Sequence, residues 1–221
     1  MRSRVRDIVA ALLGLVAWSA LGLQYVLSIG TALANGKTWA SGAVTYFSYF
    51  TILTNTLVAI VLTVPLVHPQ SPVGRWLSSP GPRSAAAAYI SVVGLVYSLA
   101  LRQIWDPQGA QLIADRLLHD VIPVLYLLFW VFFVEKGRLR WQDVGGWLAY
   151  PLVYVAYTLA RGAAIDWYPY PFLDVTQLGY IVVLGHVIVL TGGFLGIGLV
   201  FVGIDRCVAR TRGIGLSEVR P

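Results

Sequence analysis

Two residues that could do hydrolytic chemistry stand in apolar parts of this sequence. Thr51 belongs to YFSYFTILTNTLVAIVL, residues 46–62, and His119 belongs to ADRLLHDVIPVLYLLFW, residues 114–130. A threonine hydroxyl becomes a nucleophile when a neighbouring base takes its proton. A partly buried histidine tends to stay neutral, which is the form that a base requires. The pair predicts a metal-free Thr–His dyad.

Polar and small side chains accompany Thr51 at intervals of three or four residues. They would form one face of a helix: Thr45, Ser48, Thr51, Asn55, Ala59 and Thr63. We expect this face to look inward, toward other helices or a cavity. The alternative is that the stripe only supplies hydrogen bonds between helices.

Ionisable residues gather before and around His119. Asp115 stands four residues before His119, and Arg116 stands four residues before Asp120. Such groups are costly at membrane depth and are functional candidates there, although charges at headgroup level would be the simpler reading. Pro123 cannot donate to the carbonyl of His119, so we expect a kink and a free acceptor beside the imidazole.

Other polar and aromatic residues are predicted to contact a substrate on the same, outer side of the membrane: Asn55, Arg102, Trp105, Arg161, Tyr170 and Asp174. Asn55, Arg102 or Arg161 would bind an oxyanion or a carboxylate. The segment AAIDWYPYPFLDVTQ, residues 163–177, would form a rigid loop over a cavity, or an interfacial aromatic belt. His186 is expected to be a hydrogen-bonded histidine of the helix bundle.

The composition indicates a membrane protein. Hydrophobic residues make up 57% of the chain and charged residues only 12%, whereas soluble domains carry roughly 25% charged residues. The net charge of +6 is attributed to cytoplasmic loops rather than to nucleic-acid binding. The single cysteine, Cys207, excludes an internal disulfide, and without a zinc signature we expect no metal or cofactor.

Six apolar segments approach or exceed the ~20 residues that a membrane-spanning helix needs. They are residues 8–30, 44–67, 84–102, 117–134, 144–162 and 176–204. Because unpaired backbone groups are too costly in lipid, these segments predict an all-α, polytopic fold with six transmembrane helices in one domain, residues 1–221. The first segment is longer than a signal peptide's apolar region, so we expect it to be retained.

Basic residues predict the orientation. Of the Lys and Arg residues, twelve flank these segments on one side and four, Lys37, Arg102, Arg116 and Arg161, lie on the other. Lys and Arg accumulate on cytoplasmic loops, so both termini should be cytoplasmic. The chain is therefore predicted to be a multi-pass protein of the plasma membrane.

Three motifs resemble one family of six-helix membrane proteins. YFTILTN (49–55), LLHDVIPVLYLL (117–128) and YPYPFLDV (168–175) are similar to motifs of the androgen-induced-gene and androgen-dependent TFPI-regulating protein family, above all its bacterial branch. Eukaryotic members hydrolyse fatty acid esters of hydroxy fatty acids with an intramembrane Thr and His. The resemblance places these on Thr51 and His119, although the interval from the histidine to the next proline is one residue shorter here.

The sequence thus predicts a hydrolase of lipid-like esters, with Thr51 as nucleophile and His119 as general base in a cavity facing the outer leaflet. Its partners would be the membrane and a lipid or amphiphilic small molecule, not nucleic acid. One alternative is a binder or transporter of a small amphiphile that uses the same cavity without covalent chemistry. Another is an accessory subunit whose polar faces pack against a partner.

The predicted orientation is testable with reporter fusions. Alkaline phosphatase, which folds only outside the cytoplasm, should be inactive when fused to the C-terminus and active when inserted after Lys37. A green fluorescent protein at the C-terminus should fluoresce. Phosphatase activity at the C-terminus would contradict the 12-to-4 division of basic residues.

Overall fold

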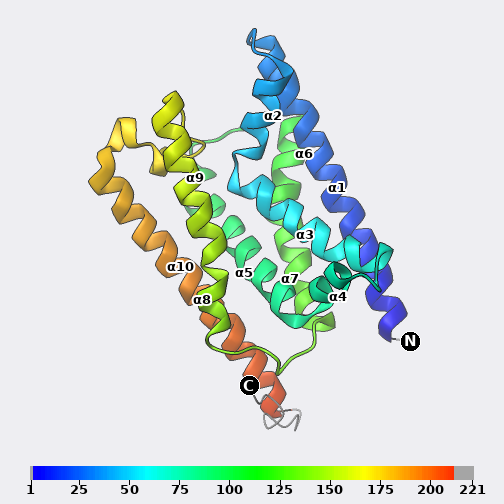
Figure 1. Cartoon of the computed structure of the whole chain (residues 1–221). Helices are drawn as coiled ribbons and strands as arrows, with labels where there is room; N and C mark the ends of the chain where they lie inside the picture. The colour runs from blue at the N-terminus through cyan, green and yellow to red at the C-terminus, as the bar shows by residue number, and fades with distance from the viewer. Residues whose placement is uncertain (1, 212–221) are drawn as a thin grey trace. The chain divides into compact units, whose positions relative to one another are not determined.

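The computed structural model describes residues 2–211, and every regular element in that range is a helix (Figure 1). Six helices are long and apolar enough to cross a membrane: Arg4–Ala34, Phe50–Val67, Pro80–Leu101, Ala110–Phe133, Asp143–Ile165 and Val175–Thr211. They confirm the predicted all-α fold of a multi-pass membrane protein. Arg212 and Arg220, two of the basic residues behind the predicted orientation, lie outside the described residues.

The chain forms two compact units, residues 1–138 and 139–221. Unit 1 contains the first four spans. They are α1 (Arg2–Ala34), α3 (Phe50–Val67), α5 (Pro80–Val96) with the π-helical turn η1 (Tyr97–Leu101), and a long helix made of α6 (Ala110–Arg116), the π-helical turn η2 (Leu117–Val121) and α7 (Ile122–Phe133). The single domain predicted for residues 1–221 stays a prediction.

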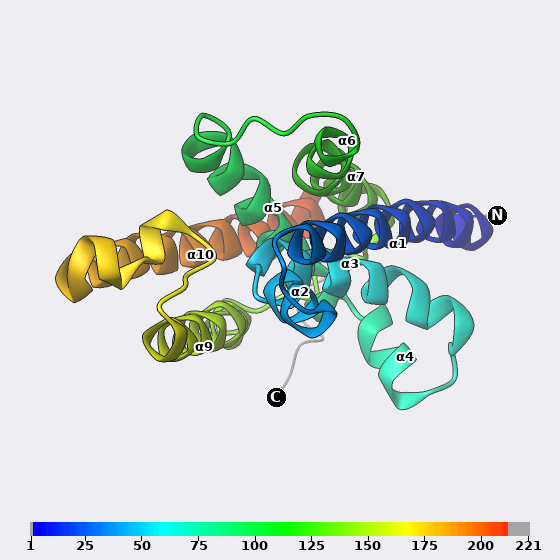
Figure 2. The same ribbon diagram turned by 90° about the horizontal axis from the view of Figure 1, so that it is seen from above.

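The four spans of unit 1 close a ring. Helix α1 packs against α3, α3 against α5, α5 against α7, and α7 against α1. The short helix α2 (Trp39–Phe47) packs on α1 and α3, while α4 (Pro72–Ser78) packs on α3 and α5 and lies outside the ring (Figure 2). The ring places α3 and η2 side by side, and these are the segments that carry Thr51 and His119.

Hydrogen bonds from two aromatic residues of α7 join it to α5. Residues 85–88 of α5 are four buried alanines, whereas Tyr126 and Trp130 are among the largest fully buried side chains. Their polar atoms are paired: Tyr126 donates to the carbonyl of Arg83 at 3.2 Å, and Trp130 Nε1 donates to Ser84 Oγ at 2.7 Å. These two bonds hold α7 against the beginning of α5.

The second predicted segment, residues 44–67, is not one helix. Helix α2 ends at Phe47, and Tyr49 is extended with φ −86° and ψ 128° before α3 begins at Phe50. The Ser48 hydroxyl donates back to the carbonyl of Val44 at 2.7 Å, a local bond that competes with helix continuation. The break therefore removes Thr45 and Ser48 from the polar face that we predicted.

The rest of that face remains on α3 and is buried or partly buried, as expected. At its C-terminal half it packs on α1: Trp18 Nε1 donates to Thr63 Oγ1 at 3.4 Å, and a methyl group placed on Gly14 would come within 2.5 Å of Thr63 Cγ2. Around Thr63 the stripe therefore serves helix packing. Only its first turns, with Thr51 and Asn55, face η2.

Unit 2 contains the last two spans. It consists of α8 (Asp143–Trp147), α9 (Ala149–Ile165), the short 3-10 helix η3 (Pro171–Leu173) and α10 (Val175–Thr211), and α10 packs against the other three. Helix α10 is bent at Gly179, whose φ of 76° suits glycine. His186 Nδ1 donates to the carbonyl of Phe172 at 2.8 Å, which confirms the expected hydrogen-bonded histidine.

Lys136 stabilises the end of α7. Its ammonium donates to the carbonyls of Trp130 at 2.6 Å and Val134 at 2.7 Å, and it lies 3.9 Å from the centroid of the Trp130 ring. The last carbonyls of a helix have no partner within the helix, and a cation there also suits the helix dipole. This lysine, which we counted with the cytoplasmic charges, is buried and holds a helix end.

Replacing Lys136 should therefore weaken unit 1. We expect Lys136→Met to lower the free energy of unfolding by ~1–3 kcal/mol, because the buried Val134 carbonyl loses the ammonium donor and the Trp130 carbonyl keeps only the main-chain N–H of Val134 at 3.3 Å. Thermal unfolding in detergent measures the change, and Lys37→Met, at an exposed lysine, is the matched control and should have almost no effect. Equal stability of the two variants would contradict the capping role.

Candidate active site

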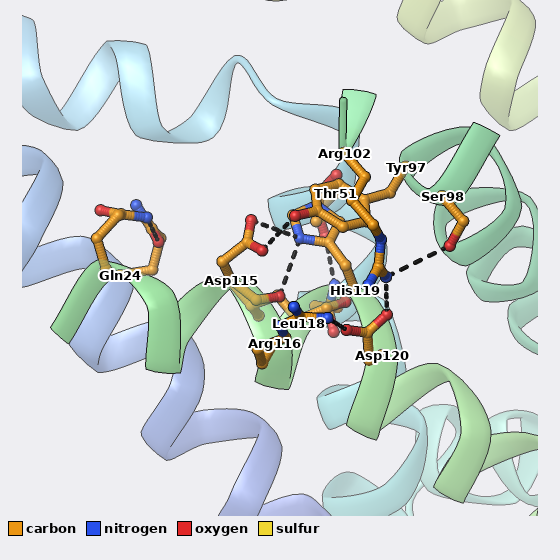
Figure 3. Close-up of polar contacts among 12 residues, drawn as sticks. Gln24, Thr51, Tyr97, Ser98, Arg102, Asp115, Arg116, Leu118, His119 and Asp120 are labelled. Atoms are coloured by element: carbon orange, nitrogen blue, oxygen red, sulfur yellow. Dashed lines mark hydrogen bonds and ion pairs between the residues drawn. The ribbon is translucent and has the colours of Figure 1, made fainter. Parts of the chain in front are cut away.

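The imidazole of His119 is held by Asp115, one turn earlier on the same helix. His119 Nδ1 lies 3.0 Å from the main-chain oxygen of Asp115 and 3.2 Å from its carboxylate Oδ1 (Figure 3). Both oxygens can only accept, so Nδ1 carries the proton. In the neutral ring the lone pair then lies on Nε2, and a carboxylate behind a histidine keeps that tautomer and orientation. His119 is therefore arranged to act as a base through Nε2.

Tyr97 completes the environment of this pair. Its hydroxyl donates to Asp115 Oδ2, and its ring stacks on the His119 ring with centroids 3.9 Å apart and planes at 14°. Asp115 is only 3% exposed, and each of its carboxylate oxygens has a partner. Our sequence reasoning did not single out Tyr97. A tyrosine inside an apolar span needs a partner for its hydroxyl, and this is the signal that would have pointed to it.

A second carboxylate joins two arginines next to the histidine. Asp120 accepts from Arg102, at the end of η1, and from Arg116 at 2.9 Å (Figure 3). The Arg102 guanidinium also lies 5.0 Å from the centre of the Tyr97 ring. With the Asp115 carboxylate, the cluster holds two carboxylates and two guanidinium groups, so its charges balance. The arginines could still stabilise a developing negative charge as hydrogen-bond donors.

The π-helical winding of η2 explains why Asn55 lies against it. The N–H of Ile122 donates to the carbonyl of Leu117, five residues earlier. In this register the next residue, Pro123, would donate to Leu118, but a proline has no N–H. Asn55 Nδ2 supplies the missing donor at 3.2 Å. The carbonyl that takes a new partner is thus Leu118's, one residue before the one we predicted, because the turn spans five residues rather than four.

Asn55 also connects Thr51 to this segment. The same Nδ2 donates to the carbonyl of Thr51 at 2.9 Å, so one amide ties the first turn of α3 to the residue before His119. Thr51 is 8% exposed and lies in the cluster of Figure 3. A hydrogen bond from the Thr51 hydroxyl to His119 Nε2, directly or through a water, stays a prediction.

The chemical role open to Asn55 is narrower than the sequence indicated. An amide has two N–H donors, and both of those of Asn55 are used by main-chain carbonyls. Its Oδ1 is buried and has no partner among the described residues. Asn55 can therefore offer a substrate or a water only an acceptor, and it has no donor left for an oxyanion.

The other predicted substrate contacts divide between the units. Trp105, in unit 1, follows η1 and is 51% exposed. The remaining three belong to unit 2. The Arg161 guanidinium lies 5.0 Å from the centre of the Trp167 ring, and Tyr170 is buried and stacks on Phe172 with centroids 5.2 Å apart. Unit 1 by itself brings together Thr51, Asn55, Arg102 and His119.

Asp174 caps a helix. It accepts from the main-chain N–H groups of Thr176 at 2.9 Å and Gln177 at 3.2 Å, and from both of their side chains. The bond from the Thr176 hydroxyl is the main reason why the pKa of Asp174 lies below its usual value. These bonds are those of an N-terminal cap of α10. Asp174, the acidic residue that follows Leu173 in this motif, thus caps the beginning of α10, the last span.

Comparisons with models of protein families, with curated proteins and with solved structures found no match to this chain. The activity must therefore be argued from the cluster in unit 1. Among residues 2–211 no group of three or more His, Cys, Asp or Glu side chains could hold a metal ion. The groups at hand for chemistry are the hydroxyl of Thr51, the oriented imidazole of His119 and the arginine pair.

The bridge made by Asn55 can be tested by restoring the missing N–H. Asn55→Ala should lower the free energy of unfolding by ~1–3 kcal/mol, because the Leu118 carbonyl loses its donor. Pro123→Ala provides a main-chain N–H at the position that π-helical winding directs to Leu118. The double variant should therefore be more stable than the sum of the single effects implies, by ~0.5 kcal/mol or more.

Thermal unfolding of the four proteins in one detergent gives this coupling. The matched control is Thr56→Ala combined with Pro123→Ala, since the Thr56 hydroxyl bonds only within its own helix, to the carbonyl of Ile52 at 2.7 Å. That pair should be additive. Additivity of Asn55→Ala and Pro123→Ala as well would contradict the bridge.

Proposed function

We propose that this protein is an intramembrane threonine hydrolase of lipid-like esters, a bacterial relative of the androgen-induced-gene family that works in the plasma membrane. The observation that carries the proposal is the Asp115–His119 pair, in which the carboxylate holds Nδ1 and leaves Nε2 as the basic nitrogen. An oriented, neutral imidazole is what a hydroxyl nucleophile needs. Packing alone does not require a buried carboxylate to be shared by an imidazole and a phenol.

In the first half-reaction, Thr51 Oγ1 attacks the ester carbonyl carbon while its proton moves to His119 Nε2. The tetrahedral intermediate collapses as the bond to the alcohol oxygen breaks, and the protonated imidazole returns the proton to that oxygen. The products are an acyl-threonine and the free alcohol. Asp115 positions the imidazole and stabilises its charged form, and Tyr97 fixes Asp115.

In the second half-reaction, His119 Nε2 takes a proton from water, which attacks the acyl-threonine carbonyl. Collapse of that intermediate returns the proton to Thr51 Oγ1 and releases the fatty acid. One water is consumed, and the ester becomes one acid and one alcohol. The same base thus acts in both halves, as in other covalent hydrolases.

Arg102 is the candidate in unit 1 for stabilising the oxyanion. Its Nε is buried and has no hydrogen-bond partner among the described residues, although one terminal nitrogen, Nη2, donates to both Asp120 and Ser98. A preoriented charged donor of this kind can stabilise a developing oxyanion. Trp105, which follows η1 in the same unit, would contact the apolar part of the substrate.

Single substitutions separate catalysis from packing. Thr51→Ala should abolish turnover of a fatty acid ester of a hydroxy fatty acid, yet leave the protein folded, since a hydrogen bond between membrane helices averages only ~0.6 kcal/mol. His119→Ala should be nearly as inactive, and the double variant little worse than either, because members of one catalytic unit are not additive. Asp115→Asn should lower kcat strongly and keep KM.

The matched control is Thr54→Ala, at a buried threonine about 60° away around the same helix. It should keep most activity. A fluorophosphonate probe should label wild-type protein at Thr51 and fail on Thr51→Ala. Near-wild-type turnover by Thr51→Ala would remove Thr51 from the mechanism, and binding of the ester without label or turnover would favour the alternative of an amphiphile binder.

A further inference from the structure

Arg83 is a buried cation without a counter-ion in the part of the chain that the structure describes. Its side chain belongs to the first turn of α5, and the residue is only 6% exposed. No hydrogen bond or ion pair reaches its guanidinium from the residues that the structure describes, and its Nε is enclosed without a partner. An isolated buried charge is strongly unfavourable unless something pairs with it.

The groups around Arg83 do not neutralise it. The ring of Phe129 lies 5.7 Å from the guanidinium carbon, a contact that offsets only part of the lost hydration. Arg6 and Asp7 of α1 are near enough to act on it electrostatically. Arg6 already holds the Asp7 carboxylate, with Nε at 2.9 Å and a terminal nitrogen at 2.8 Å. The surroundings of Arg83 therefore keep a surplus of positive charge.

The position of Arg83 favours an anion that arrives from outside the protein. Helix α5 begins at Pro80, and its N-cap residue, Ser79, makes no side-chain cap, so the positive end of the helix dipole adds to the guanidinium. Only the Nε of Arg83 is fully enclosed, which leaves its terminal nitrogens as the open side of the site. These two nitrogens are the ones that bind phosphate as a fork.

We propose that Arg83 binds the phosphate of an anionic phospholipid. It stands at the beginning of a membrane-spanning helix, Pro80–Leu101, where lipid headgroups lie and basic residues meet anionic lipids. The site is separate from the proposed catalytic cluster, since Tyr97 of η1 stands fourteen residues further along the same span, roughly 20 Å away. The lipid would serve as a structural ligand that supplies the missing negative charge.

The test compares Arg83→Met with Arg75→Met, at an exposed arginine of the neighbouring helix α4, in nanodiscs of phosphatidylcholine alone and with phosphatidylglycerol added. In phosphatidylcholine, Arg83→Met should unfold at the same temperature as wild type or higher, because an unpaired buried charge is gone. With phosphatidylglycerol, wild type and Arg75→Met should gain ~2–4 °C or more, and Arg83→Met should gain nothing. Native mass spectrometry should find phosphatidylglycerol retained by wild type and lost from Arg83→Met.

Three results would overturn the proposal. An equal loss of stability of Arg83→Met in both lipids would mean that Arg83 serves the fold alone. A matching loss in Asp7→Asn would identify Asp7 as the counter-ion. Full stabilisation of wild type by inorganic phosphate in phosphatidylcholine nanodiscs would make free phosphate the ligand. Ester hydrolysis by the same samples reports on the catalytic proposal independently, because neither arginine belongs to that cluster.

Discussion

One amide group joins the two segments on which the candidate site depends. Pro123 deprives the Leu118 carbonyl of a donor, and Leu118 is buried, so the carbonyl needs a donor from within the protein. Asn55 supplies the donor from α3 and also holds the Thr51 carbonyl. The π-helical turn that places His119 is thus tied to the turn that places Thr51. Two residues 68 positions apart come to face the same cluster because one carbonyl must be satisfied.

Charged residues in this protein serve three different purposes. Lys136 and Asp174 complete helix ends, which need cations and acceptors at their C- and N-termini respectively. Asp115 and Asp120 form mutually supporting pairs around His119. Among the described residues, the Arg83 guanidinium has no hydrogen-bond acceptor and no counter-ion. This contrast is why Arg83 indicates an external ligand, whereas Lys136, buried to the same extent, does not.

Part of the site could be read from spacing along one helix. The four-residue interval from Asp115 to His119, and from Arg116 to Asp120, predicted contacts that the structure contains. Contacts between helices could not be predicted from the spacing of residues along the sequence. Tyr97 and Arg102 reach these carboxylates from another span. Asn55 looked like a substrate ligand because a polar residue in an apolar span needs a partner, and the sequence could not show that the partner was a main-chain carbonyl.

The sequence by itself determined the six apolar spans, because ~20 apolar residues in lipid have no other stable form than a helix. It also determined which residue types were available for chemistry. Only the tertiary structure decided where the second apolar segment breaks, since that depends on how Ser48 and its neighbours bond beside α1. It likewise decided the five-residue winding at His119 and the pairing of Tyr97 with Asp115. Residue spacing predicts which side chains meet within one helix. Which buried polar groups form hydrogen bonds with one another depends on which helices pack together.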